Sequence, residues 1–140
     1  MSEPLQLATE EQRRQFIELM PYAQKLGIEI ESGNSEEVVG RMRWQPDLCT
    51  AAGVLHGGAL MSLADTIGAV CAFLNLPPGA NTATISSSTN MLRAVRSGEV
   101  TARAKPLHAG RTVIAVQTEL RDDQGRLVAQ VTQAQAVLSG

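Results

Sequence analysis

Apolar residues along this chain follow helical spacing in one central stretch and alternate with period two over most of the remainder. Between Gly57 and about Leu74, apolar residues recur three and four positions apart, which predicts a helix with a broad apolar face. That face consists of Leu60, Leu63, Ala64, Ile67, Val70, Cys71 and Leu74. The opposite side holds Met61, Asp65, Gly68, Ala69 and Ala72. Because this second side is small rather than charged, the helix is expected to be buried.

Period-two segments follow the helix and predict strands over residues 82–92, 98–108, 112–121 and 127–138. In the third segment Ile114, Val116 and Leu120 alternate with polar residues, as a half-buried strand requires. The polar stretches 108–111 and 122–125 are typical of hairpin connections. We therefore expect an antiparallel meander of four strands.

The first half of the chain predicts a short helix and two further strands. Thr9 and Gln12 have the spacing of a capping box, and Pro21 is expected to end this helix. Strands are expected over 26–31 and 37–45, joined by a turn at 33–35, with a loop over 46–55. The fold class is thus α+β, with one long helix packed on one sheet. We expect a single domain over 1–140, with residues 1–20 as an N-terminal helical extension.

Composition narrows the possible partners. The chain has 140 residues, of which 44% are apolar, enough for one core and too many for a disordered chain. Lys and Arg total 12 against 14 Asp and Glu, and only four residues are aromatic, which argues against a nucleic-acid partner. Cys49 and Cys71 form neither a metal-ligand pair nor a disulfide framework. The polar N-terminus and the interrupted apolar stretch predict a cytoplasmic protein without a membrane partner.

Asp65 is the only charged residue between His56 and Arg93, and it lies in the middle of the most apolar helix. An unpaired buried charge costs several kcal/mol, so such a carboxylate is kept for a partner or for a purpose. Asp65 is thus either a structural carboxylate, bonded to the backbone or to Ser62, or a functional group.

His56, Gly57 and Gly58 open the same helix. Helix N-termini present unpaired N–H groups with partial positive charge, which suits an anion or a developing oxyanion. Glycines there allow a substrate carbonyl to approach the backbone closely. The alternative is a loop histidine followed by glycines that only make the turn.

The distance between Gly57 and Asp65 along the helix determines whether one chain can supply both groups to one site. Gly57 and Asp65 are eight residues apart, which along a helix is about 12 Å. A donor and a carboxylate that serve one carbonyl must each lie about 3 Å from the reacting atoms. If both act together, they come from different subunits, so the sequence favours a site shared across a homodimer.

Residues 53–66, GVLHGGALMSLADT, resemble the signature of the hotdog-fold acyl-CoA thioesterases of the phenylacetate-pathway type. The order of elements is similar from about residue 21 to residue 138. The resemblance implies a long helix wrapped by a curved antiparallel sheet, and a dimer that often doubles to a tetramer. It also implies hydrolysis of an acyl-CoA, in which the Gly57 N–H polarises the thioester carbonyl. Asp65 of the partner subunit would activate water or attack directly.

Other residues take roles from the same resemblance. His56 would order its loop or contact the thioester, and Thr84 would position the attacking water. Thr50 stands where the family commonly has Asn, and its single hydroxyl offers fewer hydrogen bonds than an amide. This departure bears on the geometry of the site and on the rate.

Binding of the substrate is expected to involve both ends of the acyl-CoA. Arg93 and Arg111 resemble positions that meet the nucleotide, and Arg111 is the better candidate. For each of them, an exposed charge that guards a sheet edge is the simpler explanation. Besides Gly58 at the helix start, Met61 would contact the substrate, with Ala69 and Phe73 also lining an apolar acyl pocket. No separate cofactor and no metal are expected, because coenzyme A is part of the substrate.

Two other functions remain open at this point. One is an acyl-CoA or acyl-carrier binding module without catalysis, against which the lone carboxylate argues. The other is a dehydratase or hydratase on the same fold, although these resemble different histidine and acidic motifs. The identity of the acyl group does not follow from the sequence.

Overall fold

The computed structural model describes residues 6–139, which form an α+β fold as the patterning predicts. Its helices are α1 (Glu10–Glu18), α2 (Pro21–Lys25) and α3 (Gly57–Phe73), with a 3-10 turn at Pro46–Leu48. Its strands are β1 (Glu29–Gly33), β2 (Val38–Arg43), β3 (Asn81–Met91), β4 (Glu99–Ala109), β5 (Val113–Arg121) and β6 (Leu127–Leu138).

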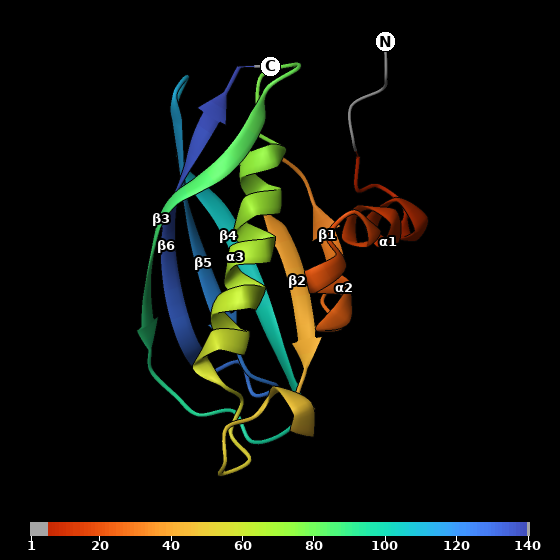
Figure 1. Ribbon diagram of the computed structural model, residues 1–140, viewed down its shortest axis with the longest axis vertical. Helices are drawn as coiled ribbons and strands as arrows, with labels where there is room; N and C mark the ends of the chain where they lie inside the picture. The colour runs from red at the N-terminus through yellow and green to blue at the C-terminus, as the bar shows by residue number, and fades with distance from the viewer. Residues whose placement is uncertain (1–5, 140) are drawn as a thin grey trace.

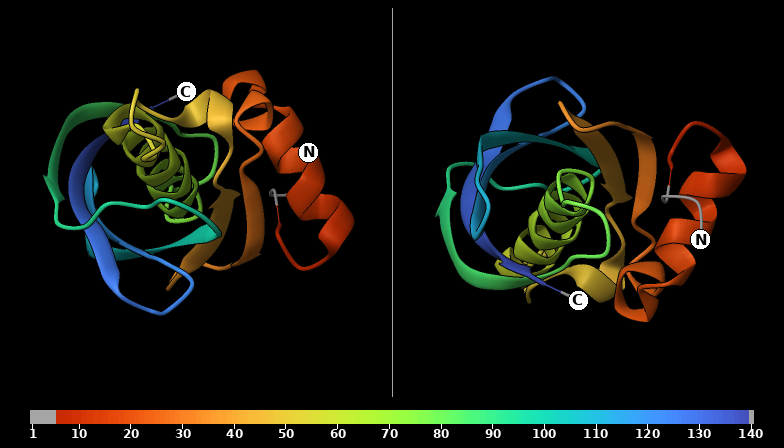
Figure 2. Two further views of the ribbon diagram at one scale, coloured as in Figure 1. Left: turned by 90° about the horizontal axis from the view of Figure 1, so that it is seen from below. Right: turned by 90° about the horizontal axis from the view of Figure 1, so that it is seen from above.

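The strands form one antiparallel sheet in the order β1-β2-β4-β5-β6-β3. Helix α3 runs along one face of this sheet, while α1 and α2 lie beside β1 (Figure 1). Seen from either end, the sheet curves around α3 (Figure 2). The arrangement expected from the sequence, a long helix wrapped by a curved sheet, is therefore confirmed.

The apolar face of α3 fills the concave side of the sheet. Leu63, Ile67 and Cys71 have no exposed surface, and they pack among inward-facing residues of β4, β5 and β6. At Gly40 of β2 the backbone comes so close to Ile67 that a Cβ atom would collide with it. Burial raises the pKa of the Cys71 thiol to about 11, so Cys71 behaves as a small hydrophobic residue.

The prediction of a four-stranded meander is wrong in one respect. Strands β4, β5 and β6 are consecutive neighbours, but β3 pairs with β6 at the far edge of the sheet rather than with β4. The segment 92–98 crosses the end of the sheet, and its Leu92 N–H donates to Val128 O at 2.8 Å. Period-two patterning identifies strands and their faces, but it carries no information on which strands are neighbours.

Two predictions at the N-terminal end need correction, whereas the capping box of Thr9 and Gln12 is confirmed. Pro21 does not end the first helix, because α1 stops at Glu18 and Pro21 is the first residue of α2, where its missing N–H costs nothing. The first strand begins at Glu29 rather than at residue 26, since α2 continues to Lys25 and Gly27 then turns the chain with φ 76°.

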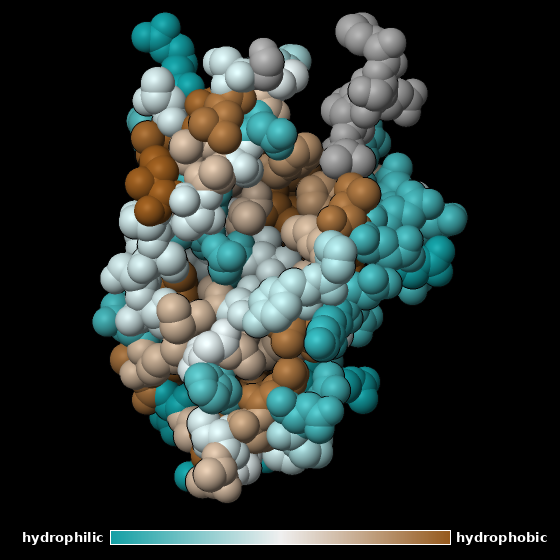
Figure 3. All heavy atoms as spheres, in the orientation of Figure 1, coloured by the Kyte–Doolittle hydropathy of each residue, from teal (hydrophilic) through white to brown (hydrophobic). Residues whose placement is uncertain are grey.

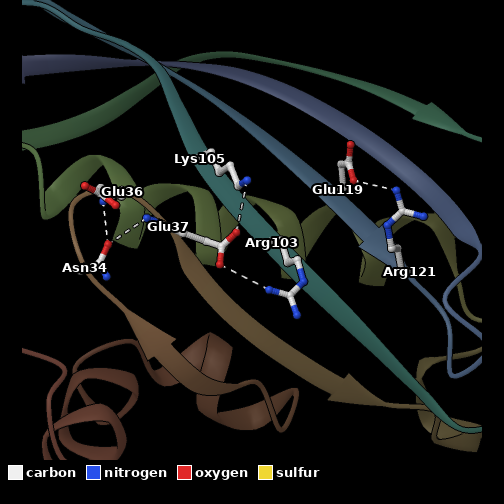
Figure 4. A network of polar contacts seen from close by, with 7 residues as sticks. All are labelled: Asn34, Glu36, Glu37, Arg103, Lys105, Glu119 and Arg121. Carbon is white, nitrogen blue, oxygen red and sulfur yellow. Dashed lines mark hydrogen bonds and ion pairs between the residues drawn. The ribbon is translucent and has the colours of Figure 1, made fainter.

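Charged side chains form ion pairs on the outer surface of the sheet. Glu37 accepts from Arg103 at 3.3 Å and pairs with Lys105 at 3.6 Å, and the side chain of Asn34 accepts the N–H groups of Glu36 and Glu37 (Figure 4). The two basic residues are thus solvated strand charges with a carboxylate partner. Such exposed pairs contribute at most about 1 kcal/mol each.

Candidate active site

The start of α3 presents one backbone donor that its own loop leaves free. His56 is the N-cap, and its Nδ1 accepts the N–H of Gly58 at 2.8 Å. The N–H groups of Ala59 and Leu60 both donate to His56 O, while within residues 6–139 no acceptor lies in hydrogen-bond range of the Gly57 N–H. Because Nδ1 accepts, a neutral His56 carries its hydrogen on Nε2. Gly57 is therefore the donor available to an external oxygen.

The loop before α3 is tied down on both sides. His56 N–H donates to Leu48 O at 2.8 Å, and Leu55 N–H donates to Val95 O at 2.9 Å. Trp44 Nε1 donates to Gly53 O at 3.0 Å, at a glycine with φ 74°. These contacts fix the direction in which the first N–H groups of α3 point.

Thr50 takes part in this loop rather than in a network around Asp65. Its N–H donates to Val54 O at 2.8 Å, and its hydroxyl lies 3.5 Å from the N–H of Ala52. Both contacts close the turn that leads to His56. A shorter side chain with one hydroxyl is suited to this local role.

Asp65 lies on the exposed side of α3, which contradicts the expectation that it is buried. The curved sheet covers one side of the helix, and within the single chain the side with Asp65 and Met61 stays open. The Asp65 Oδ1 atom accepts from Thr84 Oγ1 and from Gln133 Nε2, both at 3.4 Å. The structure thus brings Asp65 and Thr84 together, as two of the predicted catalytic residues.

A β-bulge in β3 lies next to this contact. Thr84 pairs with Gln135 and Ser86 pairs with Ala134, so Ile85 is the extra residue. The bulge reverses the alternation of β3, and it leaves Thr84 on the same face as Gln135, whose Nε2 donates to Thr84 Oγ1 at 2.8 Å. Bulges commonly re-aim side chains near active sites.

The structure does not bring Gly57 and Asp65 of one chain together. Both lie on α3, eight residues apart, which corresponds to about 12 Å along the axis. Gly57 lies beside Met91 at the end of β3, because a Cβ on Gly57 would be 3.2 Å from the Met91 methyl group. Asp65 instead contacts Thr84, nearer the start of the same strand.

The two predicted arginines lie at opposite ends of the sheet. Arg93 follows β3 and lines a pocket of about 450 Å³, which lies between residues 93–97 and the turn that joins β5 to β6. Arg111 lies in the turn between β4 and β5, at the other end. Both side chains are exposed. Within one chain, only Arg93 is near the Gly57 end of α3.

Sequence reasoning missed the glutamines beneath Asp65. Gln133 and Gln135 of β6 are each only 1% exposed and point into the concave side of the sheet. The signal was present, because period two in 127–138 places both on the face of Ala129 and Val131. Two amides on an otherwise apolar strand face indicate that a polar group lies within their reach.

Comparison with known proteins identifies similar sequences and structures. The family described as the thioesterase superfamily matches residues 52–129. The crystal structure of thioesterase HI1161 from Haemophilus influenzae is 31% identical, covers 96% of this chain and 94% of its own, and superposes with a TM-score of 0.89. A mutant of thioesterase PA1618 from Pseudomonas aeruginosa is 28% identical, with a TM-score of 0.87 over 98% of this chain and 99% of its own.

A relative from Haemophilus influenzae that is named as an esterase is 37% identical over 102 residues, which are 73% of this chain and 74% of its own length. In the part of the chain that the structure describes, no helix has the length and apolar character needed to cross a membrane.

Proposed function

Since this chain belongs to the thioesterase superfamily and has its hotdog fold, we propose that it hydrolyses an acyl-CoA thioester to a carboxylic acid and coenzyme A. One observation carries the proposal: a free N–H at the start of α3 and an exposed, hydrogen-bonded carboxylate further along the same helix. These are the two groups that acyl transfer to water requires, an oxyanion donor and a base or nucleophile.

The proposed chemistry uses the two groups in the same step. Water attacks the thioester carbon while Asp65 takes its proton, and the Gly57 N–H donates to the oxygen that becomes negative. The C–S bond then breaks, and the thiolate of coenzyme A recovers a proton. Direct attack by the carboxylate, followed by hydrolysis of the anhydride, uses the same atoms. His56 orders the donor loop through its Nδ1, and Thr84 holds the carboxylate or the attacking water.

The separation of Gly57 and Asp65 favours a homodimer in which each site takes one group from each subunit. Strand β3 offers a surface for this: it is an edge strand of the sheet and carries no charged residue. Uncharged long edges are what natural proteins avoid unless another strand covers them. In Figure 3 strongly hydrophilic colours gather over α1, whereas paler colours cover β3 and α3. This distribution supports β3, rather than the α1 side, as the dimer surface.

A two-fold axis near the middle of β3 would make two such strands antiparallel. The Thr84 end of one strand, with Asp65 beside it, then approaches the Met91 end of the other, with Gly57 beside it. The same operation carries the Arg111 turn of one subunit to the Arg93 end of its partner. Both arginines would then serve one bound nucleotide. Two such dimers would pair in a tetramer.

The remaining contacts of the substrate follow from these positions. The pocket beside Arg93 and Arg96 suits the phosphates of coenzyme A, because Arg126 on its rim pairs with Asp122 at 2.8 Å and offsets the charge of that carboxylate. Gly58 has no side chain to block the carbonyl that would approach the Gly57 N–H. Met61, Ala69 and Phe73 supply apolar surface on α3 for the acyl group.

The test is thiol release from a panel of aromatic and medium-chain acyl-CoAs, without metal or added cofactor. Cys49 is half-exposed and would react with a thiol reagent, so the assay uses the Cys49→Ser variant as well as the wild type. Measurable turnover of at least one substrate is expected. No turnover on the whole panel, with coenzyme A still bound, would replace the proposal with a non-catalytic acyl-CoA binding module.

A further inference from the structure

Two buried amides lie between the apolar core and the carboxylate of Asp65. Gln133 and Gln135 rank among the largest fully buried side chains, beside residues such as Ile67 and Leu120. Burial of an amide is favourable only when its polar atoms are bonded. The hydrogen-bond partners of Gln133 and Gln135 therefore indicate the role of these two amides.

Hydrogen bonds from two strands reach Asp65. Gln135 Nε2 donates to Thr84 Oγ1 at 2.8 Å, while the Thr82 hydroxyl lies 2.8 Å from Ala136 O and 3.1 Å from Gln135 Oε1. Because Thr84 Oγ1 accepts from Gln135, its own hydrogen is free to point at Asp65 Oδ1, 3.4 Å away. The series of donors thus ends on one carboxylate oxygen.

Gln133 reaches the same oxygen from the core. Its Nε2 lies 3.4 Å from Asp65 Oδ1, and an ionised carboxylate only accepts, so the amide must present its NH₂ group there. No hydrogen bond to Oδ2 of Asp65 is seen within residues 6–139. One oxygen is held by two donors, and the other is left for water or substrate.

This placement of Gln133 is costly for the fold. Its Oε1 is buried without a hydrogen-bond partner in the described part of the chain. An orphaned buried acceptor destabilises the folded state, which an apolar side chain of similar shape would avoid. Helix α3 has a glycine, Gly68, opposite this atom, and a side chain does not fit there because a Cβ on Gly68 would collide with Oε1 of Gln133. Glycine inside a helix is also less stable than alanine at the same position.

We propose that Gln133 is a positioning residue for the reaction: with Thr84 it holds Oδ1 of Asp65 and so directs Oδ2 at the attacking water or the thioester carbon. The inference rests on the proposed function and adds to it a group that never touches substrate. The unpaired Oε1 and Gly68 then lower the stability of the folded state, and in return they allow Gln133 to orient the carboxylate of Asp65.

The kinetic test replaces Gln133 with Met, which keeps its length and removes both polar atoms. We expect kcat to fall about 10- to 100-fold with KM unchanged, because the carboxylate loses its orientation and the binding surface is intact. Thermal stability should hold or rise. The matched control is Thr118→Val, another fully buried inward side chain with an unpartnered oxygen but no contact to Asp65, and it should keep wild-type kcat. An unchanged kcat in Gln133→Met, or a drop shared by Thr118→Val, overturns the proposal.

A second measurement is independent of activity. Unfolding midpoints of Gln133→Met, Asp65→Ala and the double variant form a cycle, and the two single shifts should not sum to that of the double variant. Additive shifts would show that the amide and the carboxylate do not interact, and would overturn the inference. An inactive wild type with coupled shifts would instead overturn the proposed function alone, and a protein that hydrolyses thioesters with additive shifts would overturn only the role of Gln133.

Discussion

At the scale of single residues, Asp65 is an exposed acceptor on α3, whose Oδ1 accepts two hydrogen bonds while Oδ2 accepts none within residues 6–139. Asp65→Asn keeps the shape and the contacts to Thr84 and Gln133 but removes the charge. We expect kcat for thioester hydrolysis to fall by a factor of about 10² or more, since an amide neither accepts the proton of water nor attacks a carbonyl. Unfolding in urea should be nearly unchanged, because the side chain is exposed. Wild-type turnover in this variant would make Asp65 a structural residue.

How far the sequence predicts such residues depends on the kind of signal. Asp65 stands out as a lone charge in an apolar stretch, yet its burial was predicted wrongly, because the pattern shows an apolar helix and not how much of it one sheet can cover. Gln133 gives a weaker signal, since glutamines occur on many strands. Its role depends on contact with a residue 68 positions away, which no local pattern contains.

At the scale of elements, the turn between β5 and β6 is stabilised by an ionised carboxylate. Partial burial raises the pKa of Asp122, but N–H donation from the backbone and guanidinium of Arg126 and from Gln124 outweighs it. The pKa therefore lies below its ordinary 3.8. A lowered pKa adds stability that is present above the unfolded value and is lost as pH falls through the folded one.

Asp122→Asn should consequently destabilise the protein at neutral pH by loss of the ion pair with Arg126. The difference from wild type should begin to shrink as pH falls below about 3.8 and should vanish below the lower pKa of the folded protein, where the carboxylate is neutral as well. Urea unfolding of both proteins across this range is the measurement. A difference that stays constant with pH would mean that the turn does not depend on the charge.

The elements themselves show where local patterns suffice. The bounds of α3 and of β4, β5 and β6 agree with the predictions within about two residues, because helical and period-two burial patterns are local. The start of α2 at Pro21 was missed, since a proline is compatible both with the residues after one helix and with the first turn of the next. The place of β3 beside β6 was missed because strand order is a long-range property.

At the scale of the whole molecule, a shared site predicts complementation between two inactive variants. Gly57→Pro removes the donor, and it suits the first position of α3, where the N–H has no acceptor among residues 6–139 and His56 already has φ −61° and ψ 137°. Asp65→Ala removes the carboxylate. Random reassortment makes about half of the dimers hybrid, each with one complete site, so roughly a quarter of wild-type activity should return.

The complementation experiment needs both variants folded and exchanging subunits, which circular dichroism and size-exclusion chromatography of the mixture establish. Gly57→Ala is the matched control, because it keeps the N–H and meets only the end of the Met91 side chain. Exchange without return of activity would show that the two groups do not meet across an interface.

The place of β3 in the sheet also has a consequence for the order in which the molecule is made. Its partners lie far downstream, since Asn81 pairs with Leu138 and Met91 with Ala129. During synthesis, α3 and β3 therefore leave the ribosome before β6, and β3 has no neighbouring strand in its own chain until translation reaches the last strand. The contacts of Asp65 with Thr84 and Gln133 are then completed only after the rest of the fold can form. In that interval an uncharged strand is free on both edges, so association of nascent chains through β3 must be slower than the arrival of β6 if the chain is to avoid aggregation.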